Sequence, residues 1–150
     1  MKRVLFICLG NICRSPAGEA VFKQFIENKG ISSEYEVDSA GTSAFHEGNQ
    51  ADERMRDHAR KRGIEITSIS RGLRDSDFEE FDFLITMDKS NYRNTQVHAN
   101  RSGNEALVKK IIPFCEHEEV PDPYYGGADG FEYVLDMLER EMPNLLDRMK

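Results

Sequence analysis

Short apolar runs alternate along the chain with segments whose residues favour helices. A continuous apolar run that is β-branched or aromatic is typical of a buried strand. Four strands are predicted, at residues 4–7, 35–40 and 83–87 and within 106–114, where the fourth is centred on 110–112. Helical spacing or a high content of helix-forming residues predicts helices at residues 16–27, 51–62, 75–80, 89–98 and about 130–149.

Glycine and proline residues indicate where these helices end or kink. Gly30 and Gly63 each follow a helical segment, at the position where a left-handed residue often ends a helix. Residues 64–66 then read as a short extended piece. Pro143 lies inside the last helix, where its missing N–H predicts a kink or a restart.

Strands that alternate with helices predict parallel βαβ units with right-handed crossovers. The expected fold is therefore α/β, a small doubly wound domain in which a four-stranded parallel sheet carries helices on both faces. Ligands bind such sheets beyond the carboxyl ends of the strands. We expect one shared rim there, formed by Cys8, Gly41, Thr42, Asp88 and the loop around Asp122.

The composition favours one globular domain over residues 1–150, with 39% hydrophobic and 31% charged residues. No apolar run approaches the ~20 residues of a membrane helix, and the apolar segment after residue 3 is too short for a signal peptide. A formal net charge of −7 argues against nonspecific binding to nucleic acid or to an anionic membrane. Three cysteines suggest no disulfide framework, so a reducing cytoplasm is expected. The oligomeric state stays open, with a monomer favoured.

The most informative stretch is residues 8–16, Cys-Leu-Gly-Asn-Ile-Cys-Arg-Ser-Pro, which joins the first strand to the first helix. Backbone N–H groups in such a loop, together with the helix dipole, form a cradle for an anion, preferably phosphate. Cys8 leaves the strand into this loop, where the N–H groups and Arg14 favour its thiolate form. Arg14 carries a planar fork that can grip two phosphate oxygens, and Ser15 is placed to hydrogen-bond the sulfur.

A strand, these nine contiguous residues and a helix resemble the low-molecular-weight protein tyrosine phosphatases. The resemblance implies hydrolysis of phosphotyrosine in proteins through a phosphocysteine on Cys8, with no metal or other cofactor. It also implies a phosphate site in the loop, made of Leu9, Gly10, Asn11, Ile12, Cys13, Arg14 and Ser15. Cys13 matches a family cysteine that can form a reversible, protective disulfide with the nucleophile. A thiol packed beneath the loop is an equal alternative for Cys13.

The general acid is expected in the proline-bearing loop at residues 120–127. Prolines on both sides restrict the backbone around Asp122, and Asp-Pro-Tyr-Tyr matches the acid loop of the family. An acid there protonates the leaving phenolate oxygen and afterwards activates water. The alternative for Asp122 is a turn residue beside proline. Aromatic walls for the substrate are implied at Phe45, Tyr124 and Tyr125, and partial burial in the core is an equal alternative for Tyr124.

Two residues match family positions that support the phosphate loop. Asn11 tolerates the left-handed backbone conformation, and Ser39 is expected to hold the loop by hydrogen bonding. Asp88, after the third strand, is expected to orient Arg14 or the loop. One position departs from the family, because Ser68 stands where a histidine is common. A less firmly supported loop and a lower activity are therefore expected.

The remaining histidine and cysteine residues are not expected to take part in chemistry. The four histidines show no metal-ligand spacing and are expected at the surface, so no metal site is predicted. They are His46, His58, His98 and His117. Cys115 is expected in the core.

Three other activities share parts of this pattern. Thioredoxin-coupled arsenate reductases of this fold need further cysteines near mid-chain, and residues 70–100 contain none. Protein arginine phosphatases of the same family carry Thr where Ile12 stands, so Ile12 favours phosphotyrosine over phosphoarginine. A non-catalytic phosphate- or phosphotyrosine-binding module stays an alternative, although a nucleophile, an arginine fork and an acid are all present.

Overall fold

The structure is a computed structural model that describes residues 1–124 and 126–150. Its strands are β1 (Lys2–Cys8), β2 (Tyr35–Gly41), β3 (Phe83–Thr86) and β4 (Ile111–Pro113). Its helices are α1 (Arg14–Asn28), α2 (Glu53–Arg60), α3 (Asp77–Glu80), α4 (Lys89–Arg101) and α5 (Ala128–Arg148). Two 3-10 turns cover Ser32–Glu34 and Glu105–Lys110. Among the described residues, none of these helices has the length and apolar character that a membrane span requires.

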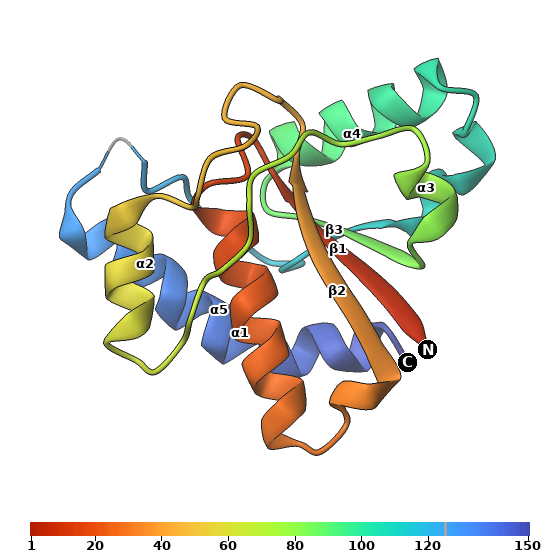
Figure 1. Cartoon of the computed structure of the whole chain (residues 1–150). Helices are drawn as coiled ribbons and strands as arrows, with labels where there is room; N and C mark the ends of the chain where they lie inside the picture. Colours follow the sequence, from red (N-terminus) through yellow and green to blue (C-terminus); the bar gives the residue numbers. More distant parts are fainter. Residues whose placement is uncertain (125) are drawn as a thin grey trace.

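Within the described part of the chain, four strands form one parallel sheet in the order β2-β1-β3-β4. The side chains of the central strand β1 alternate between its two faces. Val4 and Phe6 join the core formed with α1 and α5, whereas Leu5 and Ile7 join the core formed with α3 and α4. Figure 1 shows α1, α2 and α5 on one side of the sheet and α3 and α4 on the other. The predicted doubly wound α/β fold, with helices on both faces, is confirmed.

Two predicted elements differ from the structure. The fourth strand is short, because Glu105–Lys110 forms a 3-10 helix and only Ile111–Pro113 pairs with β3. Of the two outcomes expected at Pro143, a kink or a restart, the restart does not occur, because Pro143 lies inside a continuous α5. Its apolar stripe stays buried on both sides of the proline, at Leu138 and Leu145. This packing offsets the roughly 3 kcal/mol that an interior proline costs a helix.

The carboxyl ends of the strands meet at one rim of the sheet. Cys8 ends β1, and Asp88 follows β3 and caps α4 by accepting a hydrogen bond from the Asn91 N–H at 2.7 Å. Gly41 ends β2 directly against the loop that follows β1. A Cβ atom at this position would lie 2.7 Å from the carbonyl oxygens of Leu9 and Ser43, so only glycine allows this close approach. The rim is therefore built as the sequence predicts.

Candidate active site

The loop after β1 surrounds the Cys8 sulfur with hydroxyl and amide groups. Cys8 Sγ lies 3.0 Å from Ser15 Oγ. Asn11 Nδ2 donates a hydrogen bond to the same hydroxyl oxygen at 2.7 Å. The Ser15 hydroxyl can therefore donate its own proton either to the Cys8 sulfur or to the more distant Ala40 carbonyl oxygen, at 3.4 Å. Asn11 has a φ of 56°, as its predicted left-handed conformation requires. The Ser15 hydroxyl is thus placed to stabilise negative charge on Cys8.

The carbonyl groups of this loop point away from its centre. Four of them accept hydrogen bonds from surrounding segments, at distances between 2.8 and 3.0 Å. These pairs are Thr42 N to Cys8 O, Ser43 N to Leu9 O, Ser70 Oγ to Gly10 O and Asp52 N to Ile12 O. In a trans peptide the N–H points opposite to the C=O. The N–H groups that follow these carbonyls, of Leu9, Gly10, Asn11 and Cys13, therefore turn toward the loop centre, as an anion cradle requires.

Arg14 is buried at the first turn of α1, with only 2% of its surface exposed. Its Nη1 donates to Asp88 Oδ2 at 2.6 Å and to the Val120 carbonyl oxygen at 3.0 Å. Burial disfavours the charged guanidinium, but Cys8, Asp88 and Asp122 raise the pKa of Arg14 above its ordinary value. Asp88 therefore holds Arg14, one of the two roles expected for it.

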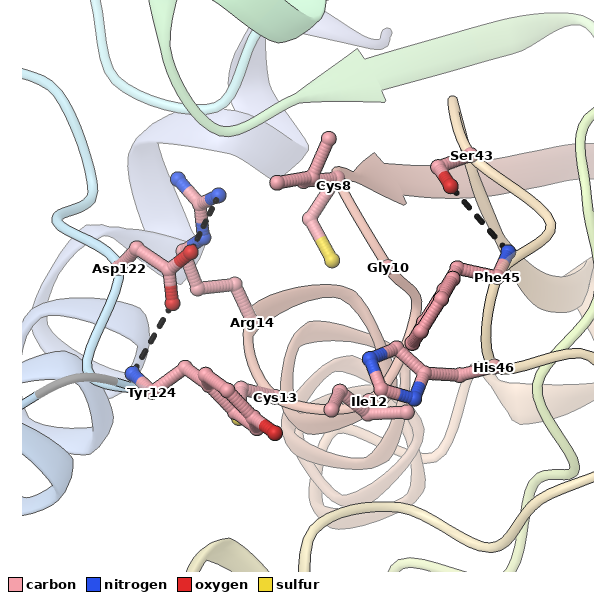
Figure 2. A pocket seen from close by; sticks show the side chains of 11 residues that line it. Cys8, Gly10, Ile12, Cys13, Arg14, Ser43, Phe45, His46, Asp122 and Tyr124 are labelled. Atoms are coloured by element: carbon pink, nitrogen blue, oxygen red, sulfur yellow. Dashed lines mark hydrogen bonds and ion pairs between the residues drawn. The ribbon is translucent and has the colours of Figure 1, made fainter.

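Asp122 lies across the cavity from the loop and faces Arg14. Asp122 Oδ2 is 3.6 Å from Arg14 Nη2, and Asp122 Oδ1 accepts a hydrogen bond from the Tyr124 N–H at 3.0 Å. Figure 2 shows the Asp122 carboxylate between these two partners, with the Cys8 sulfur pointing into the same space. The cavity has a volume of about 310 Å³, and Cys8, Arg14 and Asp122 all line it. The structure thus brings together the three residues predicted to be catalytic.

Aromatic side chains flank this cavity. Phe45, 86% exposed, lies on the side opposite Asp122, and Tyr124 lines the cavity beside Asp122 (Figure 2). The third predicted wall residue, Tyr125, lies outside the described residues. His46 also lines the cavity, with its ring 4.9 Å from that of Phe45 and 6.1 Å from that of Tyr124. His46 is half-buried and takes part in the cavity wall, a placement that the sequence did not predict.

The support of the loop differs in part from the expectation. Among the described residues, no hydrogen bond joins the Ser39 side chain to the loop, and its hydroxyl instead donates to Glu19 Oε1 in α1 at 2.7 Å. Asn11 is held instead by the backbone N–H of Arg71, which donates to Asn11 Oδ1 at 3.0 Å. Ser70, two residues after Ser68, donates to the Gly10 carbonyl oxygen. The segment around residues 70–71 therefore supports the loop even though Ser68 replaces the common histidine.

Cys13 is a buried free thiol, 3% exposed, that contributes to the lining of the cavity. Burial raises its pKa far above the ordinary value, and the negative charges of Asp52, Cys8 and Asp122 act in the same direction. Burial and the neighbouring negative charges therefore favour the neutral thiol form of Cys13. Cys115 is half-buried and packs against the main core. No cluster of three metal-ligating side chains occurs among residues 1–124 and 126–150.

Comparison with known proteins gives concordant matches. A family model described as low molecular weight phosphotyrosine protein phosphatase matches residues 3–150. The low molecular weight phosphotyrosine protein phosphatase of Schizosaccharomyces pombe is 43% identical over 136 residues, covering 86% of this chain and 85% of that protein.

Solved structures agree with the sequence comparison. A protein tyrosine phosphatase from Entamoeba histolytica, crystallised with Hepes in its active site, has a TM-score of 0.90 at 45% identity and covers 99% of this chain and 97% of that chain. The YwlE arginine phosphatase of Bacillus subtilis, in a mutant with a phosphorylated active-site serine, has a TM-score of 0.86 at 26% identity. That match covers 98% of this chain and 95% of the other.

Proposed function

The chain belongs to the low molecular weight phosphotyrosine protein phosphatase family, and we propose that Cys8, Arg14 and Asp122 perform its cysteine-dependent hydrolysis of phosphotyrosine. The observation that carries this assignment is the shared cavity, in which a sulfur, a guanidinium and a carboxyl group face the same space. We propose protein-bound phosphotyrosine as the substrate, because aromatic side chains flank this cavity.

In the first step, the Cys8 thiolate attacks phosphorus, so that an S–P bond forms and the bond from phosphorus to the phenolic oxygen breaks. The loop N–H groups and Arg14 stabilise the charge on the three remaining phosphoryl oxygens. Asp122, in its protonated form, donates its proton to the leaving phenolic oxygen. The products are free tyrosine hydroxyl and a phosphocysteine.

In the second step, the Asp122 carboxylate takes a proton from a water molecule that attacks the phosphocysteine. An O–P bond forms, the S–P bond breaks, and inorganic phosphate leaves. The Ser15 hydroxyl, 3.0 Å from Cys8 Sγ, stabilises the departing thiolate. The cycle returns Cys8 and Asp122 to their starting protonation states and uses no metal.

The alternative substrate within the family is phosphoarginine, because the structure also matches YwlE, an arginine phosphatase. Ile12 lines the cavity and gives the loop an apolar side, which suits an aromatic leaving group. We therefore place phosphotyrosine first.

We also propose that residues 1–150 form one domain that acts as a monomer in the cytoplasm. Cys8 and Cys13 stay reduced there and can pair reversibly on oxidation.

The test is steady-state hydrolysis of matched peptides that carry phosphotyrosine, phosphoserine or phosphoarginine, with EDTA present. We expect preferential turnover of phosphotyrosine, and we expect the Cys8→Ser variant to lose turnover while it still binds vanadate. Preferred turnover of phosphoarginine would move the substrate assignment to the alternative. Phosphate binding without turnover in the unmodified protein would indicate a non-catalytic module.

A further inference from the structure

Arg54, in the first turn of α2, bridges two sides of the active site. Its Nε and Nη2 donate to the two carboxylate oxygens of Asp52, at 3.1 and 2.9 Å. Nη2 also donates to the main-chain carbonyl oxygen of Tyr124 at 3.0 Å. The guanidinium carbon lies 5.5 Å from the ring centroid of Tyr124 and 4.8 Å from that of Phe131. One side chain therefore connects the N-cap of α2, the acid loop and the beginning of α5.

Asp52 gives Arg54 a firm anchor on the phosphate-loop side. The Asp52 N–H donates to the Ile12 carbonyl oxygen at 2.8 Å, which ties the N-cap of α2 to the loop. The Asp52 carboxylate accepts from the Arg54 N–H at 2.9 Å, and its side chain is only 10% exposed. Burial opposes ionisation of this carboxyl group, but hydrogen bonds from Arg54 hold its pKa below the ordinary value. The Asp52–Arg54 pair is therefore charged and fixed relative to the phosphate loop.

The Tyr124 backbone links Arg54 to Asp122 through two hydrogen bonds. Its N–H donates to Asp122 Oδ1, and its carbonyl oxygen accepts from Arg54. At the other end of the acid loop, the Val120 N–H donates to the Met87 carbonyl oxygen at 2.8 Å. The Asp122 side chain is 31% exposed, so few contacts define its orientation. Loss of the Tyr124 anchor would release one end of this short loop.

We propose that Arg54 is a positioning residue that holds Asp122 in place for proton transfer. This inference rests on the acid role proposed above for Asp122. Arg54 touches neither Cys8 nor the phosphate cradle by any hydrogen bond found among the described residues, so its effect should follow proton transfer and not phosphate binding.

The test is the leaving-group dependence of kcat/KM in the Arg54→Ala variant. For a phosphotyrosine peptide, whose leaving oxygen needs a proton, we expect a loss of about tenfold, since small misplacements of catalytic groups cost up to ~10²-fold. For a dinitrophenyl phosphate, whose leaving group departs without a proton, we expect a change below about twofold. Vanadate affinity, measured by competition, should stay within about twofold because the cradle is intact.

Two further variants separate positioning from a general loss of structure. Arg54→Lys keeps the charge but cannot span Asp52 and Tyr124 with a planar fork, so an intermediate loss is expected. Arg60→Ala is the matched control, because Arg60 lies on the same helix and pairs at the surface with Asp57 and Glu65. It should leave all these parameters unchanged.

The double variant Arg54→Ala with Asp122→Asn decides whether Arg54 acts through Asp122. We expect it to be no slower than Asp122→Asn alone, because the acid that Arg54 positions is already absent. Multiplicative losses, or equal losses for good and poor leaving groups in Arg54→Ala, would overturn the inference. A leaving-group effect in Asp122→Asn but none in Arg54→Ala would overturn it too, and would leave the proposed function standing. Failure of Asp122→Asn itself to show that effect would remove the acid assignment and the inference together.

Discussion

The phosphate loop and the acid loop face one cavity but are stabilised in different ways. In the phosphate loop, Asn11, Arg14 and Ser15 are at most 2% exposed, and four carbonyl groups are bound by neighbouring segments. In the acid loop, Asp122 keeps 31% of its side chain exposed, and hydrogen bonds fix the loop mainly near Val120 and Tyr124. In the proposed mechanism, phosphate binding would therefore depend on a buried, hydrogen-bonded backbone, whereas proton transfer by Asp122 would depend on a few surface contacts. Changes in the first should impair every substrate, and changes in the second should discriminate between leaving groups.

The largest effect is expected from Arg14→Lys in the phosphate loop. Lysine keeps the positive charge beside Asp88 but lacks the planar fork with which Arg14 is proposed to bind two phosphoryl oxygens. We expect kcat/KM to fall by about 10²–10³-fold, which is typical for the loss of a group that stabilises transition-state charge. The loss should be similar for good and poor leaving groups in a series of aryl phosphates. A loss confined to poor leaving groups would contradict the division between the two loops.

Asp122→Asn should have the next largest effect, and a selective one. For a phosphotyrosine peptide we expect kcat/KM to fall by about 10²-fold or more, within the usual range for general acid catalysis. A nitrophenyl phosphate should lose much less. The unmodified protein should show a bell-shaped pH profile with an acidic optimum, because an ionised thiol and a protonated carboxyl group are both needed. In the variant, the fall of kcat/KM on the basic side should disappear, and its persistence would exclude Asp122 as the acid.

A pair of substitutions at Asn11 measures how much its side-chain hydrogen bonds and its left-handed conformation contribute to the free energy of unfolding. Asn11→Gly keeps the positive φ but loses the bonds to Ser15 and Arg71, so we expect a drop of about 1–2 kcal/mol in the free energy of unfolding. Asn11→Ala should lose about 1 kcal/mol more, because alanine resists the left-handed conformation. Urea titration checks both values. Equal stability of the two variants would show that the conformation at Asn11 carries no strain for other residues.

The smallest effect concerns the contacts that α2 and the turn after it make with α5. Arg62 and then His58 bond to Glu132 and lower its pKa. A carboxyl group whose pKa is lower in the folded than in the unfolded chain stabilises the fold at pH values above its unfolded-state pKa. This stabilisation is lost as the pH falls through its folded-state pKa. Glu132→Gln should therefore cost about 0.5 kcal/mol at pH 7, as exposed pairs do, and this cost should shrink as the pH falls below the pKa of the Glu132 carboxyl group in the unfolded chain. A constant difference across this range would show that charge is not the cause.

Much of the molecule could be predicted because its signals are local. The buried strands read as apolar runs, and the nine residues after β1 carry a nucleophile, a fork and a left-handed asparagine within one loop. Sequence also placed Asp88 and Asp122 correctly, since parallel strands bring their carboxyl ends to one rim. Local patterns could not show contacts that form only in the folded chain.

Ser39 and His46 illustrate this limit. Ser39 bonds to Glu19, a charged residue of α1 that is only 5% exposed in the fold. His46 lines the cavity because the segment after β2 folds over the loop at Gly10, an approach between residues distant in sequence. Arg54 was missed for the same reason, since its helix reads as a charged surface helix until Tyr124 is seen beside it.

The most direct test of the account is to trap the intermediate with a phosphotyrosine peptide labelled on phosphorus. Rapid acid quenching followed by peptide mapping should find the phosphoryl group on Cys8 within a single turnover. The label should be absent in Cys8→Ser as a cysteine-bound species, while Asp122→Asn should form it more slowly. A phosphoryl group on Cys13 or on another residue, or turnover without any covalent label, would contradict the central claim that Cys8 is the nucleophile.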